Sequence, residues 1–212
     1  MTILEEITEM TIKGKRKKIG PLIEQALADN EDPQAILDAM INALDIIGER
    51  FSKGEAFVPE MLVSARTMAT GSEILKPALA AAGAEPLGKA VIGTVAGDMH
   101  DIGKNLVRMM IEGKGVEIDD LGVDVPAQTF VDYLKEHPDC QVVCLSALLT
   151  TTMPAIDETI KAIVDAGLRD SVKIMVGGAP VNQEFADEVG ADAYTTDAAA
   201  AADKIAEILK AL

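Results

Sequence analysis

The residues GDMHDIGKNLV, at positions 97–107, contain one of the chain's two histidines, His100, between two acids. Asp98 precedes it by two residues and Asp101 follows it. An aspartate at that spacing can bind one imidazole nitrogen, which leaves the other nitrogen free to ligate a metal. A metal centre built from side chains needs further ligands, and no Cys or His cluster accompanies this histidine. The pattern predicts either a metal that arrives inside its own macrocycle or a histidine that only stabilises a turn.

Other small and polar residues follow the apolar runs in the same half of the chain. Because the carboxyl ends of parallel strands meet at one edge of a sheet, we expect these residues to converge there with His100. Paired glycines at 177–178 would let a flat or bulky group approach the main chain. No GxxxxGK[ST] or GxGxxG pattern follows the first run, so a phosphate loop is not expected. The residues expected at this edge are Ser146, Thr150, Thr151, Thr152, Gly177, Gly178 and positions 194–197.

From residue 89 onward, five short apolar runs alternate with five amphipathic segments. The first run, KAVIGTVA, is typical of a parallel strand that is buried on both faces. The alternation predicts a doubly wound, flavodoxin-like α/β domain with a five-stranded parallel sheet. Its helices are expected at about 103–113, 128–136, 154–166 and 182–189, with a last one that runs to residue 212.

Residues 1–88 have a helical pattern instead. Asp32 is a suitable N-cap with Pro33 at the first helical position. Apolar residues at spacings of three and four, from Ile36 to Phe51, predict one buried face. A second long helix from Pro59, with shorter ones before residue 30 and over 72–82, would complete an all-α four-helix bundle. With 82–88 as linker, the sequence predicts a helical domain at 1–88 and a Rossmann-like domain at 89–212.

Composition limits the partners. The chain has 19 basic and 35 acidic side chains, a net charge of −16. Such an acidic surface repels nucleic acids and anionic membranes, so neither is expected as a partner. The exception is the basic segment Lys13–Lys18, which is either a solvated face or a docking patch for an acidic partner.

Cys140 and Cys144 form no disulfide framework, and we expect both to be structural. The acidic start of the sequence, MTILEEITEM, lacks the apolar segment of a signal peptide, and no apolar run reaches membrane-spanning length. These features predict a cytoplasmic protein in a reducing environment.

Three motifs carry a resemblance to a known family. Residues 98–103 (DMHDIG) match the DxHxxG signature of the B12-binding domains of methionine synthase and of corrinoid methyl-carrier proteins. Residues 146–148 (SAL) match the accompanying SxL, and residues 177–178 match the downstream GG. The helical half resembles the cap module of the same family through GERF at 48–51, GE at 54–55, FVPE at 57–60 and SAR at 64–66. The resemblance covers essentially the whole chain.

This resemblance implies a cobalamin or related corrinoid as cofactor. His100 would be the lower axial ligand of cobalt, in place of the cofactor's own benzimidazole. Asp98 would hold the other imidazole nitrogen, and Thr152 would continue this proton relay where methionine synthase has a serine. A threonine keeps the hydroxyl but has fewer rotamers.

The resemblance also implies contacts with the rest of the cofactor. Phe51 and Val58 of the cap would cover the upper, methyl-bearing face of the corrin, where the family more often has Leu at the second position. The nucleotide tail would pass between the loops into the sheet. The other implied contacts with ring and tail are Met99, Asp101, Ile102, Gly103, Ser146, Leu148, Thr150, Gly177, Gly178, Tyr194 and Ala198.

The implied function is that of a carrier which is not catalytic alone. It would carry a methyl group on cobalt between a substrate-specific corrinoid methyltransferase and a second methyltransferase that acts on a pterin or thiol acceptor. A reductive activase is implied as a further partner. Because a bound methyl group is covered when idle and exposed for transfer, the helical cap is expected to swing aside.

Two alternatives share part of the pattern. The small B12-binding subunit of a mutase has the same DxHxxG and SxL, but the helical cap favours the methyl carrier. A B12-dependent sensor pairs a similar cap with this domain, but such sensors usually carry a DNA-binding module. The only basic segment, Lys13–Lys18, is too short for one.

Overall fold

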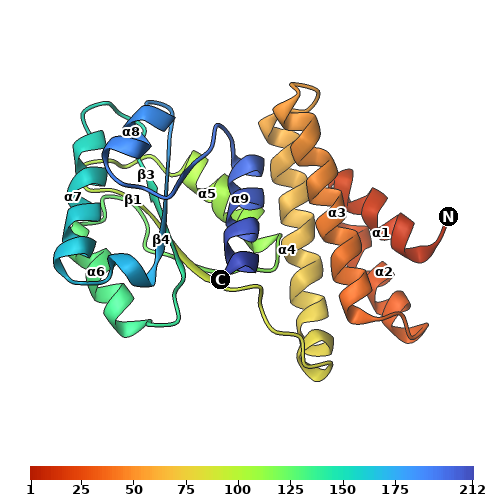
Figure 1. Ribbon diagram of the computed structural model, residues 1–212. Coiled ribbons are helices and arrows are strands. Elements are labelled where there is room, and N and C mark those ends of the chain that lie inside the picture. The colour runs from red at the N-terminus through yellow and green to blue at the C-terminus, as the bar shows by residue number, and fades with distance from the viewer. The chain divides into compact units, whose positions relative to one another are not determined.

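A computed structural model describes residues 1–212 as an all-helical unit followed by an α/β unit (Figure 1). The first unit consists of Met1–Pro86 with Glu112–Lys114, and the second of Leu87–Ile111 with Gly115–Leu212. No helix combines the length and the apolar character needed to cross a membrane.

The helical unit is the expected four-helix bundle. Helix α1 packs on α2 and α3, and α4 packs on α2 and α3. Asp32 caps the third helix by accepting the Gln34 N–H at 3.2 Å, and Pro33 follows it as predicted. The apolar face of that helix is buried from Ile36 to Ile47. The helices are α1 (Ile3–Ile12), α2 (Arg16–Ala28), α3 (Pro33–Ser52) and α4 (Val58–Ala81).

Two helix boundaries in this unit differ from the prediction. The separate helix expected over 72–82 is wrong, because α4 continues without a break to Ala81. Gly71 lies inside this helix, where a Cβ would come within 2.5 Å of Met40 Sδ. The glycine therefore allows close packing against α3. The region before residue 30 contains two helices instead of one, since Gly14, at φ +64°, ends the first.

The α/β unit contains the predicted five-stranded parallel sheet, in the order β2-β1-β3-β4-β5. The strands are β1 (Lys89–Thr94), β2 (Glu117–Asp120), β3 (Val142–Ser146), β4 (Lys173–Gly177) and β5 (Ala193–Tyr194). The helices are α5 (Ile102–Glu112), α6 (Ala127–Glu136), α7 (Met153–Asp165), α8 (Gln183–Glu188) and α9 (Ala198–Ala211), with a 3₁₀ turn at Arg169–Ser171.

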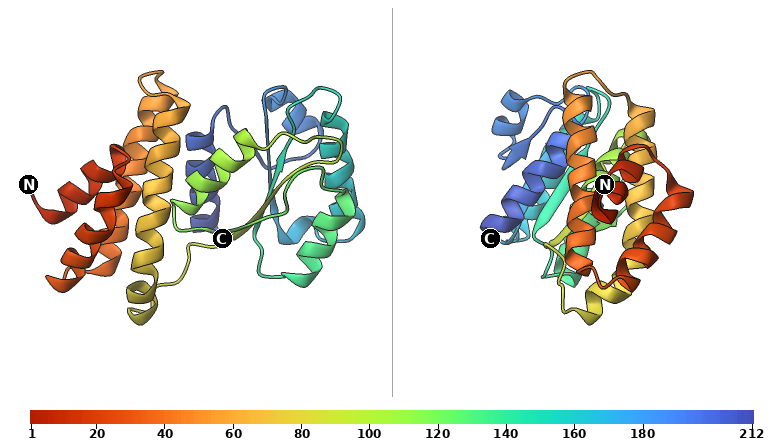
Figure 2. Two further views of the ribbon diagram at one scale, coloured as in Figure 1. Left: turned by 180° about the vertical axis from the view of Figure 1, so that it is seen from behind. Right: turned by 90° about the vertical axis from the view of Figure 1, so that its right-hand side faces the viewer.

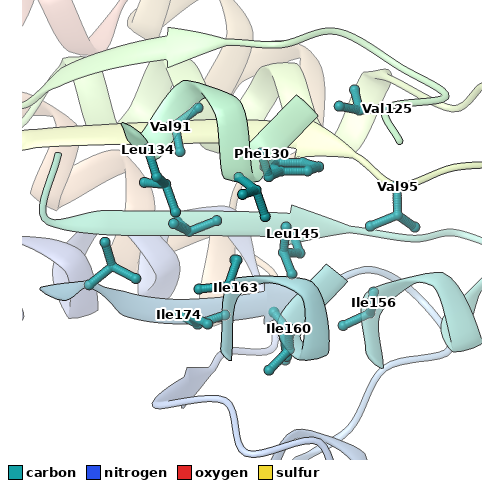
Figure 3. Packing of buried hydrophobic residues seen from close by; sticks show 14 of the residues in the cluster. Val91, Val95, Val125, Phe130, Leu134, Leu145, Ile156, Ile160, Ile163 and Ile174 are labelled. Atoms are coloured by element: carbon teal, nitrogen blue, oxygen red, sulfur yellow. The ribbon is translucent and has the colours of Figure 1, made fainter. Parts of the chain in front are cut away.

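Helices cover both faces of this sheet (Figure 2). Helices α5 and α9 lie on one face, and α6 and α7 lie on the other (Figures 1 and 2). In the core on the second face, Phe130 and Leu134 of α6 and Ile160 of α7 pack against apolar side chains of the central strands (Figure 3). Strands β1 and β3 are buried nearly throughout, which explains their unbroken apolar sequences.

The strand order reverses between β1 and β3, because the chain first adds β2 on one side of β1 and then β3 on the other. Ligands of doubly wound sheets bind at such a switch point, outside the carboxyl ends of the strands. The register places Thr94, Ser146 and Gly177 side by side at that edge. The loops that begin there carry most of the predicted site residues.

Candidate functional site

His100 lies in the loop after β1, and its side chain is 51% exposed. Its Nδ1 is 2.7 Å from Asp98 Oδ1, the contact expected from their spacing. Because a carboxylate only accepts hydrogen bonds, Nδ1 carries a proton, and in the neutral imidazole the lone pair is then on Nε2. The loop thus presents one imidazole nitrogen as a ligand at the exposed edge of the sheet.

Asp98 is fully buried, and its carboxylate accepts five hydrogen bonds. Oδ1 accepts from the main chain and the ring of His100, at 3.1 and 2.7 Å. Oδ2 accepts from the Leu148 and Leu149 N–H groups, at 2.7 and 3.4 Å, and from Thr152. Burial by itself would raise the pKa of this carboxyl, but bonds from Thr152, Leu148 and His100 outweigh it and hold the pKa well below its usual range. Asp98 is therefore ionised in the folded protein.

Thr152, in the loop after β3, is the predicted third member of the relay. Its hydroxyl is 2.7 Å from Asp98 Oδ2 and 2.9 Å from the Leu149 carbonyl oxygen. One hydroxyl proton can serve only one of these acceptors at a time. The structure therefore joins His100, Asp98 and Thr152 in one chain of hydrogen bonds, although Thr152 is 54 residues from Asp98 in the sequence.

Two residues that the sequence analysis did not single out also hold this loop. Thr94, the last residue of β1, donates its hydroxyl proton to the His100 carbonyl oxygen at 2.8 Å. Asp124, in the loop after β2, accepts the Gly97 N–H at 2.7 Å. A threonine at a strand end carries no distinctive sequence signal, and an aspartate in the stretch GVDVP is distinctive only once its positive φ is known.

Exposed apolar side chains belong to the same two loops and to the first residue of α5. Met99 and Ile102 are 68% and 74% exposed, and Leu148 and Leu149 are more than two-fifths exposed. Large apolar side chains gathered on loops at one edge favour an apolar ligand surface. Leu149 was not predicted, and Leu148 contributes its main-chain N–H to Asp98 as well as its side chain.

The predicted glycines differ in their surroundings. A Cβ on Gly103 or Gly177 would meet no atom within 4 Å, so each leaves open space beside the main chain. Gly178 has a φ of +126°, and a Cβ there would lie 1.7 Å from the Ala147 carbonyl oxygen. Only glycine can occupy that position, because its main chain crosses the loop after β3 at close range.

The remaining predicted residues lie near the same ends of the strands. Ser146 is half-buried at the end of β3, and Thr150 is exposed in the following loop. Tyr194 ends β5 and is half-buried, whereas Ala198 is buried at the start of α9. Asp101 directly precedes α5, where its carboxylate accepts from the Asn105 side chain at 3.1 Å.

Phe51 and Val58, the predicted cap contacts, belong to the helical unit. Phe51 is half-buried in α3, and Val58 is exposed as the first residue of α4. Their contact with a cofactor stays a prediction.

The donor set at this edge fits a corrinoid. No group of three or more His, Cys, Asp or Glu side chains could hold a bare metal ion, and the Asp98 carboxylate is fully engaged by the protein. A single imidazole suits a metal whose equatorial ligands come from a macrocycle. The exposed apolar side chains and the open space at Gly103 and Gly177 suit a large ring with an attached tail.

Comparisons with known proteins agree with this geometry. Two family models, each described as a B12 binding domain, match residues 88–203 and residues 3–76. Dimethylamine corrinoid protein 3 of Methanosarcina acetivorans is 37% identical over 98% of this chain and 97% of its own length. Trimethylamine corrinoid protein 1 of the same organism is 42% identical over 88% of this chain and 87% of its own.

A solved structure has the same fold. The methanol:cobalamin methyltransferase complex MtaBC from Methanosarcina barkeri contains a chain that matches 99% of this one with a TM-score of 0.85 and 26% identity. The match covers 80% of that chain.

Proposed function

This chain belongs to the family of B12-binding corrinoid proteins of methylamine and methanol methyltransferase systems, and we propose that it binds a corrinoid through His100 at the carboxyl edge of its sheet. In this role it carries a methyl group between enzymes and is not catalytic alone. The bound cofactor supplies a cobalt ion that takes the methyl group from one enzyme and gives it to the next. The observation that carries the site assignment is the bond from exposed His100 to buried, ionised Asp98.

Asp98 sets the chemistry of the histidine. Its carboxylate holds the proton on Nδ1, so that Nε2 is the ligating atom, and its negative charge makes the imidazole a stronger donor. Because Asp98 is itself held by Leu148 and Thr152, the ring is aimed by a rigid group. The imidazole therefore needs little reorganisation when it binds the metal.

Thr152 can adjust to a change of protonation in this chain. While Asp98 is ionised, the Thr152 hydroxyl donates to Oδ2. If Oδ2 took up a proton, the hydroxyl could turn to the Leu149 carbonyl oxygen and accept a hydrogen bond from the carboxyl group. The loop after β3 thus stabilises both protonation states.

The surrounding residues supply contacts for the ring and tail. Met99, Ile102 and Leu148 would offer apolar surface to the ring. The open space beside Gly103 and Gly177 would receive the tail, with Ser146 and Thr150 as hydrogen-bonding groups. In the helical unit, Phe51 and Val58 are the side chains that would contact the ring.

The partners follow from the carrier role. A substrate-specific methyltransferase loads the methyl group, and a second methyltransferase transfers it to a pterin or thiol acceptor. A reductive activase returns an inactivated cofactor to its active state. The complex MtaBC supports the first of these partners. Relatives that carry dimethylamine or trimethylamine in their names support a methylated amine as donor.

The site assignment is tested by reconstitution with cobalamin. The wild type and His100→Ala are refolded or incubated with cobalamin, and unbound cobalamin is removed. The absorbance spectra of the two proteins are then compared. We expect wild type to retain the cofactor with a protein imidazole as ligand, and His100→Ala to lose that spectrum. A wild type that retains no corrinoid would refute the function, and a variant with the wild-type spectrum would refute the role of His100.

The donor is identified by mixing the reduced, loaded protein with purified methyltransferases for methanol and for mono-, di- and trimethylamine, each with its substrate. Methylation is followed by absorbance. We expect a methylamine enzyme to methylate the protein fastest. Methylation by the methanol enzyme alone would overturn the choice of donor but not the carrier function.

A further inference from the structure

Asp124 contacts the histidine loop at two points. Its main-chain N–H donates to the Asp98 carbonyl oxygen at 2.9 Å, and its Oδ1 accepts the Gly97 N–H at 2.7 Å. These bonds hold both ends of the segment 97–98, which leads directly into His100. The loop after β2 thus fixes the main chain on which the Asp98–His100 pair is built.

The backbone of Asp124 is held in an uncommon conformation. Its φ is +53°, and the only other non-glycine residue with a positive φ is Asn30, at +62° in the turn between α2 and α3. A positive φ raises the conformational energy of any residue with a side chain, and Asp and Asn adopt it more readily than most others. Such strain persists where surrounding contacts enforce it, and functional sites are where it concentrates.

Thr94, the last residue of β1, is bonded to both the loop after β1 and the loop after β2. It is fully buried, its N–H donates to the Gly122 carbonyl at 3.0 Å, and its own carbonyl accepts the Val125 N–H at 2.9 Å. Its hydroxyl donates to the His100 carbonyl oxygen at 2.8 Å. The main chain of His100 is thereby tied to the end of β1 and, through it, to the loop that carries Asp124.

We propose that Asp124, together with Thr94, is a positioning residue that holds the His100 loop in the ligating geometry before the corrinoid binds. Neither side chain is bonded to the imidazole, so both act through the main chain. The inference rests on the proposed function, because its consequence is the fraction of bound corrinoid that takes the protein's imidazole. Small displacements of a positioned group have large effects on such contacts.

The ligated fraction can be measured without any activity assay. The protein is produced with histidine labelled with the heavier nitrogen isotope and loaded with cobalamin, and the cobalt is brought to its divalent, paramagnetic state. Electron paramagnetic resonance then distinguishes the two ligands, because the ligating nitrogen splits the lines of the cobalt signal. A labelled protein imidazole gives doublets, whereas the cofactor's own unlabelled base gives triplets.

We expect Asp124→Gly to lower the ratio of imidazole-ligated to unligated cofactor about tenfold, in keeping with the loss of a hydrogen bond to a charged group. Asp124→Asn keeps the Oδ1 acceptor and tolerates the positive φ, so it should stay within about twofold of wild type. Asn30→Gly changes the same type of backbone position in the helical unit and is the matched control. A merely structural role would lower stability without changing the ligated fraction.

Two further measurements keep the outcome decisive. In protein without corrinoid, Asp124→Gly should speed hydrogen exchange of the Gly97 amide about tenfold. If that variant does not fold, Thr94→Val, which loses the bond to His100, is compared with Thr94→Ser, which keeps it. Unchanged ligation and unchanged exchange in Asp124→Gly, or equal ligation in the two Thr94 variants, would overturn the inference. A wild type with no doublets would instead refute ligation by His100.

Discussion

At the scale of single residues, the site depends on a carboxylate that is buried and still ionised. Asp98 achieves this because all its acceptor positions are used by donors from two loops. The same bonds make it important for stability, since removing its charge would leave buried N–H and O–H groups without a strong acceptor. Asp98 therefore contributes to folding as well as to ligand geometry.

Asp98→Asn should lower the free energy of unfolding by about 2–3 kcal/mol near neutral pH. Because the pKa of Asp98 is lowered in the folded protein, its contribution is present above the unfolded pKa of about 4 and is lost as pH falls below it. The gap between wild type and variant should therefore shrink in acid. Urea denaturation at neutral pH and at about pH 3 measures it, with exposed Asp101→Asn as control. A gap that widens in acid would contradict this assignment.

The two adjacent glycines should respond differently to alanine. Gly178→Ala forces a Cβ against the Ala147 carbonyl at a strained φ, and should cost about 3 kcal/mol or more of stability. Gly177→Ala places its Cβ in open space and should change stability little while weakening corrinoid binding. Thermal unfolding and cobalamin titration separate the two effects. Equal stability losses would refute the distinction.

At the scale of elements, the switch point between β1 and β3 brings the two functional loops together. Residues 97–101 and 147–152 follow neighbouring strands whose register pairs Thr94 with Ser146. The third loop, after β2, reaches the site from the other side of β1. The site is thus a property of strand order rather than of any one segment.

The continuity of α4 has a direct test in its two prolines. Pro77 lies inside the helix, where it removes a main-chain hydrogen bond, whereas Pro59 lies in the first turn, where no such bond is lost. Pro77→Ala should stabilise the helical unit by about 1–3 kcal/mol. Pro59→Ala should change stability by less than about 1 kcal/mol. Helical circular dichroism during urea unfolding measures both, and a destabilising Pro77→Ala would show that the helix is broken there.

At the scale of the whole molecule, the reactivity of the two cysteines measures the unfolding of the α/β unit alone, because both lie in it. Cys140 and Cys144 are both buried in the α/β unit and form no disulfide. Burial raises the pKa of Cys140 to about 12 and raises that of Cys144 further. Both thiols are therefore inert until the sheet opens.

Labelling by a thiol reagent should be slow for both cysteines in the folded protein and complete after unfolding in urea. Cobalamin at about 100 times its Kd should slow labelling about 100-fold, because it binds only the folded unit. His100→Ala should keep the slow labelling but lose most of the added protection. Rapid reaction of either thiol in the folded protein would contradict their burial.

Much of this protein follows from local sequence pattern. The alternation of strands and helices follows from helical and extended repeats in the sequence. The N-cap at Asp32 and the contact of His100 with Asp98 each join residues that are only two positions apart. The bundle was predicted with the right number of helices but with wrong boundaries, since Gly14 ends a helix and Gly71 does not. Both glycines pack closely against another residue, but Gly14 has a positive φ and Gly71 keeps the helical conformation, a difference that the residue type does not reveal.

What the tertiary structure alone decided is how distant residues meet. Asp98 finds donors in Leu148 and Thr152 because β3 lies next to β1, and no local pattern encodes that order or its register. The roles of Asp124 and Thr94 emerge for the same reason. The sequence by itself determined the elements and the chemical character of the ligand, because local periodicity predicts the elements and short motifs such as residues 98–103 indicate the ligand. The sheet's non-local pairing decided which side chains hold that ligand in place.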